Sequence, residues 1–210
     1  MDSKTNVAVL VSGGGTNLQA LLDAETGGRL PHADIALVIS NVRDAYALER
    51  AKKAGVPTAV VIKKELGSQE AFEQRILDLI TVHDIDLIVL AGFMTILSAD
   101  FVSRFPERII NVHPALLPSF CGKGFYGLKV HEAALQRGVK VTGATVHFVN
   151  EIPDGGKIIS QKAVEVRDGD TPETLQKRVM EEAEWVLLPE AVEMVAEKLY
   201  NEYYHIGDEA

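Results

Sequence analysis

Short apolar runs alternate with stretches of helical periodicity through the first half of the chain. The apolar runs lie at residues 7–11, 35–39, 57–62 and 85–91. The amphipathic stretches between them lie at residues 17–25, 45–54 and 69–82. Strands that are apolar at nearly every position are buried on both faces, as in a parallel sheet covered by helices. The pattern therefore predicts a doubly wound, mostly parallel α/β fold of the Rossmann-like type.

The second half of the chain begins with a different pattern. Residues 141–149 alternate between two faces, and a second run covers residues 157–166 after a turn at residues 153–156. Two such runs joined by a short, glycine-containing loop predict an antiparallel hairpin. We therefore expect the parallel sheet to continue into an antiparallel C-terminal extension.

A long helix is expected to close the chain. It should begin near Thr171, because Pro172 is suited to the first turn of a helix. We expect it to continue to about Tyr203, with a break before Pro189, since the residue before a proline disfavours helical geometry. The expected architecture is thus an α/β sheet, an antiparallel extension and a long C-terminal helix.

The composition narrows the class of protein. The chain has 210 residues, of which 47% are hydrophobic and 24% are charged, as in soluble globular proteins with a substantial core. Its formal net charge of −9 argues against a nucleic-acid partner, because such proteins carry a basic face. One cysteine is too few for a disulfide framework, and no apolar run reaches the ~20 residues of a membrane span. With no secretory signal at the polar N-terminus, we expect a cytoplasmic protein without a membrane partner.

Polar side chains lie where the predicted strands end. Ligands of doubly wound sheets bind beyond the carboxyl ends of the strands, here at Ser12, Asn41, Ala91 and the pair Asn111 and His113. Because side chains alternate along a strand, Asn111 and His113 point to the same face. An amide can stabilise an oxyanion and an imidazole can transfer a proton, which suits acyl chemistry. The alternative is that both are ordinary strand-end groups bonded to backbone.

Three adjacent glycines follow the first predicted strand, in the sequence SGGGTN at residues 12–17. Glycines allow a close approach of the backbone, and the N-terminus of the next helix offers free N–H groups to an anion. The sequence is neither a Walker loop nor GxGxxG, since Leu18 occupies the place of the third glycine. We therefore expect one phosphate rather than a dinucleotide. The alternative is a plain strand–helix turn capped by Thr16 or Asn17.

Asp154 is the candidate partner of His113, although it lies forty-one positions later, in a turn. A carboxylate beside an imidazole stabilises its protonated form and fixes its tautomer. Transfer of an acyl group to an amine needs such a proton carrier, because the amine loses a proton while the leaving nitrogen gains one. The alternative is that Asp154 only caps its own turn, as most turn aspartates do.

The remaining histidines and the cysteine raise the question of a metal site. Long, irregular spacings separate His113, Cys121, His131, His147 and Asp154, and the chain has no HxxxH, HExxH or CxxC motif. We therefore predict no metal. His147 fits the strand alternation and is interpreted as an ordinary strand residue. His131, at a helix start, is a candidate to face a substrate, and Cys121 is interpreted as a bystander.

These motifs together resemble those of the phosphoribosylglycinamide (glycinamide ribonucleotide) formyltransferase family, folate-dependent enzymes of purine synthesis. The matching stretches are SGGGTN at 12–17, LAGFMTILS at 90–98, NVHPALLPSF at 111–120, VTGATVHFV at 141–149 and DGGKIISQ at 154–161. They follow the family's order over most of the chain. The resemblance, with the lack of any linker, implies the single-domain bacterial type. Its one domain would cover residues 1–205, with a phosphate-binding half to about residue 110 and a catalytic and folate half from about 111.

The resemblance implies transfer of the formyl group of 10-formyltetrahydrofolate, a co-substrate, to the amino group of glycinamide ribonucleotide, without a metal. Asn111 would hold the formyl oxygen, His113 would act as general acid, and Asp154 would support His113 and pass protons through water. The implied ribonucleotide site comprises Gly15, Thr16, Asn17 and Glu184. The implied folate site comprises Gln69, Met94, Thr95, Ile96, Leu97 and Asn111. Only these small molecules are expected as partners, with the chain as a monomer or a homodimer.

The chain departs from the family pattern around both substrates. Gln69 and Thr95 stand where arginines are common near the folate tail, and Trp185 stands where a histidine is usual. The loop at residues 122–127 is longer than in many relatives. The catalytic trio is unchanged, so the departures concern affinity rather than reaction class.

Three alternative functions are compatible with parts of this pattern. Methionyl-tRNA formyltransferase shares the Asn, His and Asp residues but carries a C-terminal domain and a basic surface for tRNA. A formyltetrahydrofolate hydrolase-type relative shares the domain but adds an N-terminal regulatory domain. A non-catalytic phosphosugar-binding module would keep the glycine loop without a reason to place Asn111, His113 and Asp154 together.

Overall fold

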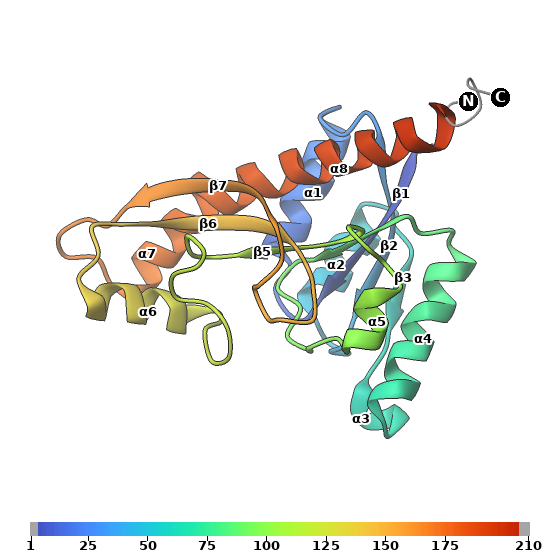
Figure 1. Cartoon of the computed structure of the whole chain (residues 1–210), viewed down its shortest axis with the longest axis horizontal. Coiled ribbons are helices and arrows are strands. Elements are labelled where there is room, and N and C mark those ends of the chain that lie inside the picture. Colours follow the sequence, from blue (N-terminus) through green and yellow to red (C-terminus); the bar gives the residue numbers. More distant parts are fainter. Residues whose placement is uncertain (1–3, 206–210) are drawn as a thin grey trace.

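The computed structural model describes residues 4–205, and this part of the chain contains a seven-stranded sheet with helices on both faces (Figure 1). The strand order is β3-β2-β1-β4-β5-β6-β7. The bounds are β1 (Thr5–Val11), β2 (Ala33–Ser40), β3 (Thr58–Val60), β4 (Leu87–Leu90), β5 (Ile109–His113), β6 (Val141–Phe148) and β7 (Ile158–Glu165). The first five strands pair in parallel, whereas β5 with β6 and β6 with β7 pair antiparallel. The predicted fold class is confirmed.

The helices form one layer on each face of the sheet. Their bounds are α1 (Thr16–Thr26), α2 (Tyr46–Lys53), α3 (Lys63–Leu66), α4 (Gln69–Val82), α5 (Ala99–Ser103), α6 (Leu128–Arg137), α7 (Pro172–Val179) and α8 (Trp185–His205). The buried side chains of α1, α2, α7 and α8 share one apolar core, and those of α4 and α5 share the other. Figure 1 shows α8 along one side of the sheet and α4 and α5 on the other.

Strand β1 illustrates why the apolar runs lie at the centre of the sheet. Val7, Val9 and Val11 pack into the core with α1 and α8, while Ala8 and Leu10 pack into the core with α4. All five are fully buried. Because alternate side chains enter opposite cores, neither face of β1 can be polar, as the continuous run predicted.

The predicted break in the C-terminal helix is displaced. The expectation of a break directly before Pro189 is wrong, because Pro189 lies inside α8. The interruption is a π-helical segment, η1 (Met180–Glu184), between α7 and α8. A proline deprives the carbonyl four residues earlier of its N–H partner, and here that carbonyl belongs to Trp185, next to η1. The π-helical segment ends at Glu184, directly before this residue.

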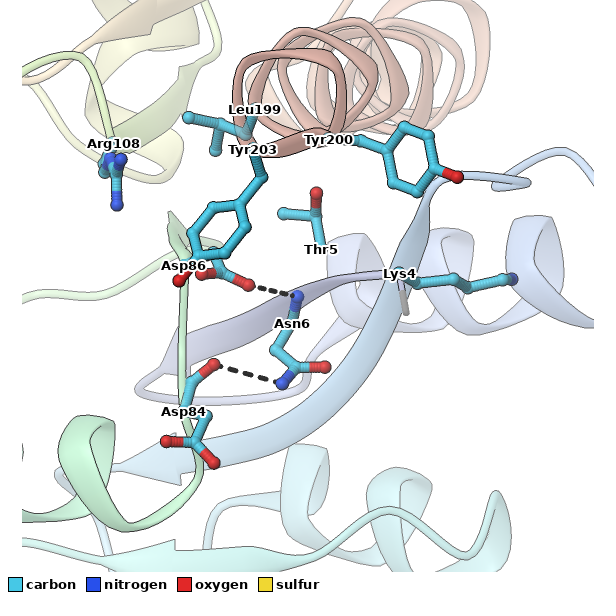
Figure 2. A pocket seen from close by; sticks show the side chains of 9 residues that line it. All are labelled: Lys4, Thr5, Asn6, Asp84, Asp86, Arg108, Leu199, Tyr200 and Tyr203. Carbon is cyan, nitrogen blue, oxygen red and sulfur yellow. Dashed lines mark hydrogen bonds between the residues drawn. The ribbon is translucent and has the colours of Figure 1, made fainter. Parts of the chain in front are cut away.

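The amino ends of the strands carry a crevice of their own. A cavity of about 200 Å³ lies between the start of β1, the residues before β4 and the last turns of α8. Figure 2 shows Asn6 at its centre, with the backbone N–H donating to the Asp86 carboxylate and the side-chain amide to the Asp84 carbonyl. The strand-end residues Asn111 and His113 lie at the opposite, carboxyl edge of the sheet. Within residues 4–205, no helix combines the length and apolar character needed to cross a bilayer.

Candidate functional site

The end of β5 places Asn111 and His113 opposite two residues of β6. In the antiparallel register, Asn111 faces His147 and His113 faces Thr145. The Asn111 side-chain amide lies 3.2 Å from His147 Nε2. His147 Nδ1–H donates to the Phe148 carbonyl at 2.8 Å, which leaves Nε2 to accept from Asn111. His147 is therefore part of the cluster as well as a satisfied strand residue, and its pairing with Asn111 depends on a register that the sequence pattern did not supply.

Asp154 lies between the two imidazoles. Its Oδ2 is 3.7 Å from His113 Nδ1, and its Oδ1 is 3.7 Å from His147 Nε2. The residue has a positive φ of 56°, a conformation that aspartate tolerates better than most residues and that turns the side chain back toward β5 and β6. The structure thus brings the three sequence-predicted catalytic residues together and adds His147 to them.

The segment after β5 covers this cluster. His113 Nε2–H donates to the Phe120 carbonyl at 2.9 Å, so Nδ1 is the ring nitrogen that faces Asp154. The Gly122 N–H donates to Asp154 Oδ2 at 2.8 Å. Thr145 holds the start of the segment, because its hydroxyl donates to the Ala115 carbonyl. These backbone contacts fix the ring orientation of His113 on one side and the carboxylate on the other.

The charge of Asp154 follows from its donors. Burial raises the pKa of Asp154, but the facing His147 ring, the Gly122 amide and the charge of His113 together hold that pKa below its usual value. The carboxylate is therefore ionised at neutral pH. A cavity of about 140 Å³ opens beside it. Its lining includes Asn111, His147 and Asp154, together with Phe93, Thr95, Ile96 and Leu97.

The glycine loop lies at the carboxyl end of strand β1, which β4 separates from β5. The alternative of a plain turn capped by Thr16 or Asn17 is not what the structure shows, since Gly15 is the N-cap of α1 and no side chain caps the helix. Gly15 has a φ of 71°, and a Cβ there would lie 2.6 Å from the Cβ of Ala47. Cβ atoms at Gly13 and Gly14 would meet nothing within 4 Å. The loop therefore approaches α2 on one side and leaves open space beside its backbone.

Asn17 and Glu184 meet behind this loop. Asn17 Nδ2–H donates to Glu184 Oε2 at 2.7 Å, and the two residues are only 8% and 6% exposed. Glu184 comes from the last position of η1, so the π turn brings the predicted acidic residue against α1. Burial raises the pKa of Glu184, and the bond from Asn17 opposes this rise without cancelling it. Thr16 adds a second link, from its hydroxyl to Met180 Sδ at 3.9 Å.

The segment at residues 92–98 lies between the glycine loop and the cluster of Asn111, His113, His147 and Asp154. Met94 is 52% exposed and Ile96 is 70% exposed, whereas Leu97 is buried. Gln69 Nε2–H donates to the Ile96 carbonyl at 3.1 Å, and Asn41 Nδ2–H donates to Thr95 Oγ1 at 2.7 Å. The predicted folate residues thus form one wall, with two apolar side chains open to solvent.

The expectation that His131 faces a substrate is wrong, whereas nothing in the structure contradicts the interpretation of Cys121 as a bystander. His131 has no exposed surface, so it does not face a substrate, and neither ring nitrogen has a hydrogen-bond partner among residues 4–205. Burial, with a smaller effect of the His113 charge, lowers the pKa of His131 to about 4. Burial and the nearby Asp154 raise the pKa of the Cys121 thiol. No three His, Cys, Asp or Glu side chains of the described region are grouped as a metal site requires.

Comparison with known proteins identifies the family of this arrangement. The model of the formyl transferase family matches residues 5–192. The trifunctional purine biosynthetic protein adenosine-3 of Gallus gallus is 46% identical over 194 residues, which cover 92% of this chain and 19% of that protein. The chain therefore spans about a fifth of the length of this relative.

Single-domain relatives match along nearly their whole length. The phosphoribosylglycinamide formyltransferase of Haemophilus influenzae is 42% identical over 191 residues, which cover 91% of this chain and 87% of that protein. The crystal structure of glycinamide ribonucleotide transformylase 1 from Symbiobacterium toebii superposes with a TM-score of 0.86 at 42% identity, covering 93% of this chain and 89% of that one. The resemblance predicted from the sequence is confirmed, and the chain belongs to the formyl transferase family, with phosphoribosylglycinamide formyltransferases among its similar members.

Proposed function

We propose that this protein is a folate-dependent formyltransferase that transfers the formyl group of 10-formyltetrahydrofolate to the amino group of glycinamide ribonucleotide. The products would be N-formylglycinamide ribonucleotide and tetrahydrofolate, in purine synthesis. The observation that carries the proposal is the cluster in which Asp154 lies 3.7 Å from both His113 and His147, with Asn111 bonded to His147. Family membership supports the reaction class.

The cluster has the groups that formyl transfer needs. The ribonucleotide amine attacks the formyl carbon, a new C–N bond forms, and the bond from that carbon to the folate nitrogen breaks. Asn111 Nδ2–H would donate to the oxygen as negative charge develops on it, after exchanging its bond to His147 for one to the substrate. The attacking nitrogen loses one proton and the leaving nitrogen gains one, so the protons balance.

His113 and Asp154 would carry this proton. A protonated His113 ring has an N–H at Nδ1, and this N–H would face the ionised Asp154 carboxylate. The protonated His113 would donate to the formyl oxygen and to the leaving folate nitrogen. Asp154 would pass on, through water, the proton that the attacking amine loses. Because the Phe120 carbonyl accepts from Nε2, a substrate must use Nδ1 or displace the Phe120 segment.

Two subsites beside the cluster suit the two substrates. The ribonucleotide phosphate would bind the open backbone at Gly13 and Gly14 and the N-terminus of α1, with Gly15, Thr16, Asn17 and Glu184 around it. The folate would bind the 140 Å³ cavity, against Asn111 and the wall formed by Met94, Thr95, Ile96 and Leu97, with Gln69 behind that wall. We place the enzyme in the cytoplasm, as a single domain that uses no metal.

The test is a direct assay of formyl transfer. Purified protein is mixed with 10-formyltetrahydrofolate and glycinamide ribonucleotide, and formation of tetrahydrofolate and of the formylated ribonucleotide is followed separately. Transfer to the ribonucleotide is the expected result. Release of formate without transfer would instead support the hydrolase-type function, and binding of the ribonucleotide without either reaction would support the non-catalytic module.

A further inference from the structure

Two hydrogen bonds fasten the segment at residues 92–98 to strand ends on the glycine-loop side of the sheet. The Met94 N–H donates to Ser12 Oγ at 2.8 Å. The Asn41 side-chain amide donates to Thr95 Oγ1 at 2.7 Å. Ser12 follows β1 and Asn41 follows β2, and these two strands pair with each other. Consecutive residues of the segment are thus tied to consecutive strands.

Ser12 also begins the glycine loop, because Gly13 is the next residue. The loop in turn is attached to α2, where the Ala47 N–H donates to the Gly13 carbonyl at 3.0 Å. Displacement of the loop therefore moves Ser12 and, through its hydroxyl, the backbone at Met94. The Ser12 side chain thus joins the glycine loop to residues 92–98, which the proposed function assigns to different substrates.

The segment is held by side-chain hydrogen bonds rather than by a helix or a strand of its own. It lies between β4 and α5 and belongs to neither a helix nor a strand. On its far side it is held by α4, through Gln69 to the Ile96 carbonyl and through Glu73, which accepts from the Ser98 N–H at 2.6 Å. A segment without regular structure depends on such side-chain bonds for its position. The two bonds from Ser12 and Asn41 are the ones that set its distance from the glycine loop.

We propose that Ser12 and Asn41 are positioning residues that hold residues 92–98 in register with the glycine loop, so that occupation of either subsite favours ligand binding at the other. The inference rests on the proposed function for the identity of the two ligands. Neither residue takes part in the chemistry. An anion bound to the loop restrains Ser12 and with it the segment, and by thermodynamic reciprocity a folate on the segment restrains the loop.

The experiment measures this linkage with ligands that do not react. Tetrahydrofolate carries no formyl group, so it forms a stable complex with the enzyme and glycinamide ribonucleotide. Its dissociation constant is measured by calorimetry with and without saturating ribonucleotide, for the wild type, Ser12→Ala and Asn41→Ala. We expect the ribonucleotide to tighten tetrahydrofolate binding to the wild type. In each variant we expect about a three- to tenfold weaker binding of tetrahydrofolate and a smaller tightening, the size of one lost hydrogen bond.

Two further variants separate positioning from general damage. Ser12→Thr keeps the hydroxyl acceptor and should retain the linkage. Ser103→Ala removes a hydroxyl that only donates to the Asp100 carbonyl within α5, and should leave all constants unchanged. Tetrahydrofolate binding and linkage at wild-type values in both Ser12→Ala and Asn41→Ala would overturn the positioning role alone. A wild type that binds neither ligand would overturn the proposed function itself.

Discussion

Two largely buried carboxyl groups, Asp154 and Glu184, lie near the carboxyl-terminal ends of the strands and have opposite pKa shifts. Asp154 and Glu184 are both largely removed from solvent, and burial raises the pKa of each. Asp154 accepts from the Gly122 N–H and faces two imidazoles, and its pKa lies below the usual value. Glu184 has one donor among the described residues, Asn17, and its pKa lies above the usual value. The groups around Asp154 outweigh the effect of its burial on its pKa, whereas the single bond from Asn17 does not outweigh the burial of Glu184.

The difference separates two kinds of subsite. An ionised carboxylate between imidazoles can orient a proton carrier and accept a hydrogen bond from its N–H, which is what the proposed transfer step requires. A carboxyl group that burial keeps closer to neutrality can instead exchange hydrogen bonds with hydroxyls of a bound sugar at a smaller electrostatic cost. Cavity size gives no such information, since the crevice at the amino edge, at about 200 Å³, exceeds the 140 Å³ beside Asp154.

Removing the charge of Asp154 is the strongest test of the difference between the two carboxyl groups. Asp154→Asn keeps the shape and removes the anion that faces His113, so we expect turnover to fall about 10²- to 10⁴-fold, the usual share of general acid–base catalysis. His113→Ala should show a loss of the same order. Steady-state kcat at neutral pH is the measurement, with the midpoint of thermal unfolding recorded for each variant.

Asp84→Asn is the matched control for this substitution. Asp84 has a φ of 48°, close to the 56° of Asp154, but it lies at the amino edge of the sheet. Asparagine tolerates such a conformation as well as aspartate does. Asp84→Asn should therefore keep full activity. Near-native kcat in Asp154→Asn would contradict the assignment of Asp154 to the proton path.

His131 extends the comparison to a buried group that has no hydrogen-bond partner among residues 4–205. Its pKa of about 4 lies below that of an unfolded histidine, so the folded state binds fewer protons between pH 4 and 6.5. Stability from this residue is therefore present above pH 6.5 and is lost as the pH falls toward 4, by roughly 3 kcal/mol. We expect urea unfolding of His131→Leu to lack this part of the acid-induced loss.

His83→Leu provides the comparison for the histidine substitution. His83 follows the last turn of α4 and is only partly buried, so its replacement should leave the loss of stability between pH 6.5 and 4 in place. An identical pH dependence of the unfolding free energy in the wild type and His131→Leu would show that His131 is not held neutral by burial.

Among the described residues, Asn17 is the one that donates a hydrogen bond to the Glu184 carboxyl group. Asn17→Ala should weaken the binding of glycinamide ribonucleotide about tenfold, because it removes one hydrogen-bonding side chain from the phosphate subsite and leaves Glu184 unpartnered. Calorimetric titration with the ribonucleotide measures the effect. Gln74→Ala, which removes an exposed amide bonded to Asp78 on α4, is the control and should bind normally. An unchanged dissociation constant in Asn17→Ala would argue against the phosphate site.

The sequence alone predicts which residues belong to the His113–Asp154 cluster and to the Asn17–Glu184 pair, but it does not predict which of them contact each other. The strand alternation that puts Asn111 and His113 on one face is local, and so is the glycine run before α1. The pairing of Asn111 with His147 depends on the β5–β6 register, and that of Asn17 with Glu184 on a π turn. Both are tertiary outcomes that no periodicity in one segment records. His131 shows the same limit, because its helix position was readable and its complete burial was not.

The smallest expected effect concerns Glu184 itself, the member of the comparison whose pKa is raised. Because the folded-state pKa of Glu184 is raised, its contribution to stability is complete below the unfolded pKa and is lost as the pH rises through the folded value. Glu184→Gln keeps an oxygen acceptor for Asn17 without the charge. The variant should be more stable than the wild type at pH 8 and equally stable near pH 4. Urea unfolding at both pH values measures this. If Glu184→Gln were less stable at pH 8, the Asn17 bond would hold the anion after all, and both carboxylates would belong to one class.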